Sequence, residues 1–122
     1  MDRTTQHYLA ALDRAKLDAE SRIAHLEAEG RQDEADLEKI RRNVLAHFAK
    51  LAQQDALKGQ QEGAAGFARV HAPRFDHMAE PWRQRQQKAA DHGDVVAQTI
   101  EETKLKTLRQ IWTLYQQTEV RE

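Results

Sequence analysis

Apolar residues recur every three or four positions through the first 58 residues, and this spacing predicts two long amphipathic helices. In the first helix the stripe follows a heptad pattern that one lysine interrupts, and it consists of Leu9, Leu12, Lys16, Ala19, Ile23 and Leu26. A buried lysine is costly, so Lys16 is expected either at the edge of the apolar face or at a position that sets the register of a helix pair. Gly30 is placed to end this helix in a left-handed conformation.

A second stripe begins after a short connection at Arg31-Gln32, and it contains Leu37, Ile40, Val44, Phe48 and Leu51. Asp33 is the expected N-cap of this second helix, and Gly59 is its expected end. Two long helices joined by so few residues must fold back on one another. The sequence therefore predicts an antiparallel helical hairpin over residues 1–59.

Residues 60–93 break the helical pattern. Glycines and both prolines of the chain gather in this part. Pro73 suits the first turn of a new helix, whereas Pro81 either kinks a helix or starts another. Gly93 followed by Asp94 marks a boundary, because glycine often follows a helix and aspartate often caps the next one.

A strong apolar stripe then returns between Val95 and Thr118, which predicts a long final helix within residues 94–122. The expected fold is all-α, with a long-helix hairpin, a broken third helix and a long fourth helix. An up-and-down four-helix bundle with coiled-coil-like packing is the favoured arrangement, in one helical domain over residues 1–122.

The composition narrows the choice of function. The chain has 122 residues and a net charge of -1, so the molecule as a whole has no strong attraction to nucleic acid. It has no cysteine, which excludes disulfides, thiolate metal sites and cysteine nucleophiles. Because the sequence also has no apolar run of the length that a membrane span needs, a cytoplasmic protein is expected. No cofactor is expected, and the sequence has neither a GxGxxG motif nor a P-loop.

One cluster of residues has the chemistry of a metal site. Imidazole and carboxylate groups bind zinc, iron or manganese, and four of them lie close together in the sequence: His71, Asp76, His77 and Glu80. Their spacing matches neither HExxH nor the Glu-x-x-His pattern of di-iron bundles. The alternative interpretation is a solvated, proline-interrupted connector that is rich in histidine.

A second cluster is basic and aromatic, and it comprises Arg69, Arg74, Trp82, Arg83, Arg85 and Lys88. Arginines beside an exposed tryptophan are typical of surfaces that hold phosphates and stack on bases. Residues 69–92 contain five basic and three acidic residues, which is a small excess for such a surface. The alternative is that Trp82 packs on the core and the arginines stay in water.

The stripes themselves favour a non-enzymatic interaction or assembly module over either chemical alternative. Apolar helix faces usually form a core or bind another helix, and a homodimer or a helical protein partner is expected. The residues expected in the core or at an interface are Leu9, Leu12, Ile23, Trp112 and Tyr115. No catalytic residue is predicted: Ser21, the only serine, lies in the middle of a charged helix. A small metal- or ligand-binding protein, a class that includes enzymes, with its site in the His-rich segment 71–92 is the second hypothesis, and a weak nucleic-acid binder is the third.

Overall fold

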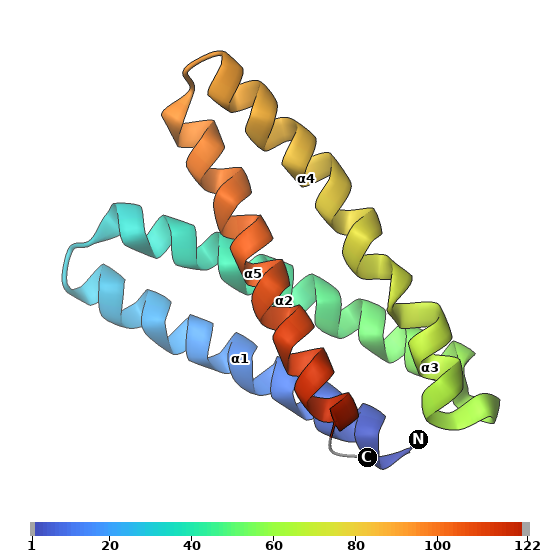
Figure 1. Cartoon of the computed structure of the whole chain (residues 1–122). Coiled ribbons are helices and arrows are strands. Elements are labelled where there is room, and N and C mark those ends of the chain that lie inside the picture. Colours follow the sequence, from blue (N-terminus) through green and yellow to red (C-terminus); the bar gives the residue numbers. More distant parts are fainter. Residues whose placement is uncertain (1, 121–122) are drawn as a thin grey trace.

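The computed structural model describes residues 2–120, and this part of the chain is an all-α helical bundle, as the sequence predicts (Figure 1). Its elements are α1 (Arg3–Ala28), α2 (Gln32–Lys58), the short 3₁₀ helix η1 (Gln60–Glu62), α3 (Gly63–His71), α4 (Pro73–Asp91) and α5 (Val95–Val120). The broken third helix of the prediction corresponds to α3 and α4. None of the described helices is both long enough and apolar enough to cross a membrane.

A capping residue begins α1, and glycines end the long helices close to the predicted positions. Asp2 caps α1 by accepting a hydrogen bond from the backbone N–H of Thr5. Gly30 and Gly93 both have positive φ, at 73° and 67°, and each turns the chain into an antiparallel hairpin. The prediction that Asp33 is the N-cap of α2 was wrong. Arg31 takes the cap position and α2 begins at Gln32, so Asp33 lies in the first turn, where the helix dipole favours its negative charge.

Two hairpins make up the bundle, α1–α2 and α4–α5, and α5 packs across both helices of the first hairpin. The α4 helix instead lies along α5, and its first turns contact α3. Figure 1 shows that α5 runs across α2 and α1 and that the two hairpins diverge toward the α1–α2 turn and the α4–α5 turn. Among the described residues, the far half of the α4–α5 hairpin is therefore covered only by its own two helices.

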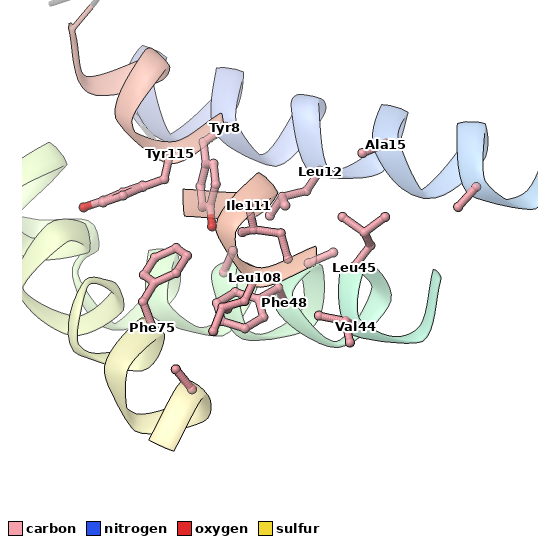
Figure 2. Close-up of a cluster of buried hydrophobic side chains, with 14 of the residues drawn as sticks. Tyr8, Leu12, Ala15, Val44, Leu45, Phe48, Phe75, Leu108, Ile111 and Tyr115 are labelled. Atoms are coloured by element: carbon pink, nitrogen blue, oxygen red, sulfur yellow. The ribbon is translucent and has the colours of Figure 1, made fainter. Parts of the chain in front are cut away.

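The core sits where the hairpins cross (Figure 2). Its largest fully buried apolar side chains are Tyr8, Leu12, Leu45, Phe48 and Ile111, which come from α1, α2 and α5. Burying each such side chain contributes about 1.5 to 3 kcal/mol. On α4, Phe75 and Ala79 join this core, and the small Ala79 and Ala89 are the buried residues that follow Phe75 along the helix.

A close backbone contact positions α3 against the end of α2. A Cβ atom on Gly59 would lie 2.4 Å from the carbonyl carbon of Gly66, and one on Gly66 would lie 2.5 Å from the carbonyl oxygen of Gly59. Only glycine fits at both positions. This contact brings His71, the last residue of α3, back toward the C-terminal turns of α2.

Helix α4 runs without interruption through Pro81, so of the two predicted outcomes the restart at Pro81 was wrong. Proline lacks the N–H that would bond the carbonyl of His77. Both residues are exposed, so water can satisfy that carbonyl and the cost of the missing bond is small. Pro73, in contrast, starts α4, as predicted.

Candidate functional site

The most concentrated polar chemistry inside the described chain is a buried cluster of Tyr8, Asp55, His71 and Arg74, which we call the Asp–His cluster. These residues come from α1, α2, α3 and α4 respectively. Tyr8, Asp55 and His71 are essentially inaccessible to solvent, and only Arg74 is partly exposed. Such groups are stable in a core only when their hydrogen bonds are satisfied.

His71 uses both ring nitrogens. Nδ1 lies 2.9 Å from a carboxylate oxygen of Asp55, and Nε2 lies 2.7 Å from the hydroxyl of Tyr8. Because an ionised carboxylate only accepts, Nδ1 donates to Asp55, and the Nε2 of a neutral ring therefore accepts a hydrogen bond from the Tyr8 hydroxyl. Burial lowers the pKa of His71 and outweighs the opposing effect of Asp55, so the neutral ring is favoured.

The charge of Asp55 is balanced by Arg74. Two guanidinium nitrogens of Arg74 donate to the two carboxylate oxygens, at 3.0 and 2.7 Å. Burial by itself would raise the pKa of Asp55, but the hydrogen bonds from Arg74 and His71 outweigh burial and leave that pKa lowered. The carboxylate is thus ionised, and both of its oxygens accept hydrogen bonds.

Aromatic rings enclose the cluster. The ring of Phe67 stacks on His71 with the centroids 4.8 Å apart, and Phe48, Phe75 and Tyr115 approach the imidazole at 5.5 to 5.9 Å. A cavity of about 250 Å³ lies beside Tyr8 and Phe67, but neither His71 nor Asp55 lines it. The cluster's main effect is therefore to join four helices through hydrogen bonds in the centre of the bundle.

The four predicted metal ligands do not come together. His71 points into the core and is saturated by Asp55 and Tyr8, whereas Asp76, His77 and Glu80 are exposed on α4. Within residues 2–120 no group of three or more His, Asp or Glu side chains is arranged to hold a metal ion. Of the four, His71 is the buried residue, whereas Glu80 contacts its α4 neighbours Gln84 and Arg83 at the surface.

The basic and aromatic cluster is also divided. Arg74 belongs to the Asp–His cluster, while Arg85 pairs with Glu101 of α5 at 3.7 Å. Trp82 is half-buried against the core, with the ammonium of Lys104 5.9 Å from its ring centroid. The arrangement follows the alternative interpretation, in which Trp82 packs on the core.

The predicted core or interface residues take different positions. Leu12, Ile23 and Tyr115 are buried within the chain. Leu9 is partly buried against the core, and Trp112 is 39% exposed. An interface with a partner therefore needs apolar side chains other than the three that are already covered.

Such side chains lie at the turn between α4 and α5, in a segment that we call the arm tip (residues 89–102). Val95 and Val96 are 69% and 72% exposed. Beside them, a groove of about 440 Å³ between α4 and α5 has Ala89, Ala97 and Ile100 in its wall. Both valines fall at the start of the apolar stripe that the sequence predicts between Val95 and Thr118, but the sequence does not show that the stripe is uncovered there.

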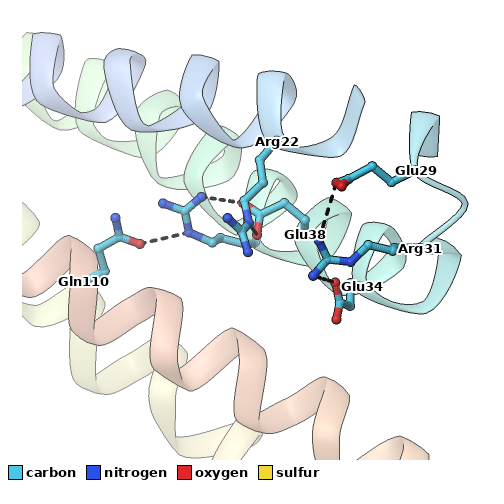
Figure 3. Close-up of polar contacts among 7 residues, drawn as sticks. Arg22, Glu29, Arg31, Glu34, Glu38 and Gln110 are labelled. Carbon is cyan, nitrogen blue, oxygen red and sulfur yellow. Dashed lines mark hydrogen bonds and ion pairs between the residues drawn. The ribbon is translucent and has the colours of Figure 1, made fainter. Parts of the chain in front are cut away.

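A larger groove of about 750 Å³ separates the α1–α2 hairpin from α5, and we call it the inter-hairpin groove. Figure 3 shows the polar contacts along it. Arg41 joins the two hairpins, because it donates to Gln110 of α5 at 3.1 Å and to Glu38 at 2.6 Å. Arg22 also pairs with Glu38, at 3.5 Å.

Comparisons of this chain with protein-family models, with curated proteins and with solved structures found no match.

Proposed function

We propose that this protein is a non-enzymatic helical assembly module that associates with a second copy of itself through the far half of the α4–α5 hairpin. The observation that carries the proposal is the exposure of Val95 and Val96 beside an apolar groove, on the far half of a hairpin that none of the other described helices covers there. Contiguous apolar surface of this kind is typical of interaction sites.

The rest of the bundle supports an assembly role over a chemical one. The Asp–His cluster is enclosed by aromatic rings, and its hydrogen bonds are made within the chain. Such a cluster holds helices together and keeps the hairpins at a fixed angle. A rigid scaffold that presents an apolar tip suits association with another helical surface.

A two-fold homodimer is the simplest assembly, because identical chains associate most often with this symmetry. Each tip then covers apolar surface of the other copy. The net charge of -1 offers little repulsion between copies. We expect a homodimer at micromolar concentration.

The test uses Val96→Glu and a matched control, Leu17→Glu. Leu17 is an exposed apolar residue as well, at 61%, but it lies on α1 away from the arm tip. Size exclusion with light scattering should give a dimer for the wild type and for Leu17→Glu, and a monomer for Val96→Glu. Circular dichroism should show the same helix content in all three.

A monomeric wild type, or a Val96→Glu variant that dimerises as well as the control, would refute the proposal. If Leu17→Glu alone were monomeric, the interface would lie on α1 instead, which would also refute it.

A further inference from the structure

The arm tip is acidic as well as apolar. Residues 89–102 include four acidic residues and neither lysine nor arginine. Three of the four, Asp91, Asp94 and Glu102, are exposed. The fourth, Glu101, is buried and paired with Lys104 at 2.8 Å. The exposed valines therefore lie beside exposed carboxylates, while the two basic residues that line the same groove, Arg85 and Lys88, lie on α4 before the arm tip.

The inter-hairpin groove has the opposite charge. Five basic residues line it, Arg22, Arg31, Arg41, Lys106 and Arg109, against two acidic residues, Glu34 and Glu38. The three arginines of the first hairpin each pair with a glutamate. In the described part of the chain, Lys106 and Arg109 on α5 have no acidic partner within ion-pair distance.

One face of α5 connects the groove to the arm tip. Thr103 and Thr107 line the groove. Ile100 and Val96 precede Thr103 by three and seven residues, so they lie on the same helix face. The wall that α5 contributes to the groove thus continues as an apolar strip of Ile100 and Val96 toward the α4–α5 turn, where the α1–α2 hairpin has diverged from α5 (Figure 1).

We propose that the acidic arm tip of one copy enters the basic inter-hairpin groove of a second copy, and that the second copy returns the same contact. This inference rests on the proposed self-association and adds where the tip binds. Val96 and Ile100 of each copy then pack against the apolar strip of the other. Asp91 and Glu102 approach the unpaired Lys106 and Arg109 across a two-fold axis.

Charge reversal tests the contact. The groove variant carries Lys106→Glu and Arg109→Glu, and the tip variant carries Asp91→Lys and Glu102→Lys. All four residues are exposed, so the helices should form normally, and circular dichroism checks this. Each variant alone opposes like charges at both contacts of the dimer. We expect each to dimerise at least about tenfold more weakly than the wild type.

The mixture of the two variants is the decisive sample. In a heterodimer the acidic groove of one chain meets the basic tip of the other, and the remaining contact has the wild-type charges. Two variants that are separately monomeric should therefore form a dimer when mixed, as measured by sedimentation velocity with one chain fluorescently labelled. The neutral pair Lys106→Gln and Arg109→Gln should weaken the dimer less than charge reversal does.

The outcomes separate this inference from the proposed function. If the wild type and both charge variants are dimeric, the chain self-associates but the tip does not bind the groove, and the inference is overturned. If both variants are monomeric and the mixture stays monomeric, the reciprocal contact is overturned. A monomeric wild type overturns the proposed function and the inference together.

Discussion

The substitution Asp55→Asn tests whether the Asp–His cluster holds the bundle together. It preserves the size of a fully buried side chain and removes its charge. The carboxylate accepts two hydrogen bonds from Arg74 and one from His71. An amide has one acceptor oxygen and a donating NH₂ group, so at least one of these donors would then face another donor.

The expected loss of stability follows from the burial of each partner. Disrupting a buried ion pair at one partner costs about 3 to 5 kcal/mol. The side chain of Arg74 keeps 28% of its surface in solvent and can turn toward water, so the lower end of that range applies, about 3 kcal/mol. For a chain of this length, such a loss lowers the melting temperature by roughly 10 to 15 °C.

Urea unfolding followed by circular dichroism measures this loss, with the free energy extrapolated to water. The matched control is Asp36→Asn, which makes the same change at an exposed residue of α2 whose contacts are Gln32 and Lys39. We expect the control to change stability by less than about 0.5 kcal/mol. If Asp55→Asn changed stability no more than the control does, the buried cluster would not support the fold as described.

Three further predictions concern the turns and the histidine. Gly30→Ala should destabilise the protein by about 1 kcal/mol in the same urea assay, because alanine disfavours φ of 73°, and a stabilising effect would contradict the hairpin turn. Gly66→Ala should cost about 2 kcal/mol or more, because its Cβ would overlap the backbone of Gly59; an unchanged melting temperature would show that the helices separate freely. Because burial keeps the pKa of folded His71 below its unfolded value, its contribution is complete above about pH 6.5 and is lost as the pH falls below that value. His71→Gln should therefore lose less stability than the wild type between pH 7 and pH 5, and equal losses would contradict a neutral buried ring.

The helices themselves were predictable from the sequence because helix-forming composition, caps and apolar spacing agree over most of the chain. The face of α1 was predicted less well. The expected stripe used Leu9 and Lys16, whereas the buried positions are Tyr8 and Ala15. A one-residue rotation of the face is favoured here because it brings the hydroxyl of Tyr8 to His71, while Lys16 keeps part of its surface in water.

The candidate site was only partly predictable. The sequence predicted His71 as a metal ligand because other possible ligands lie nearby in the sequence. Its actual partners are Asp55 and Tyr8, which are 16 and 63 residues away. Local spacing carries no signal for such contacts. The glycines at 59 and 66 were the available clue, because two glycines around a tight turn permit α3 to fold back onto the end of α2.

The uncovered arm tip also depended on tertiary structure. The sequence of residues 82–92 is largely polar and offers little apolar surface to cover a bundle. It did not indicate that α4 follows α5 away from the first hairpin, which leaves Val95 and Val96 exposed. The angle between the two hairpins is set by core packing and by the buried hydrogen bonds, and neither is visible in a one-dimensional pattern.

Self-association is tested most directly by the mass of the unmodified protein over a range of micromolar concentrations, measured by sedimentation equilibrium. The chain mass is 14.1 kDa. We predict a mass that approaches twice this value as the concentration rises and returns toward it on dilution. A mass that stays at 14.1 kDa across the whole range would contradict the account.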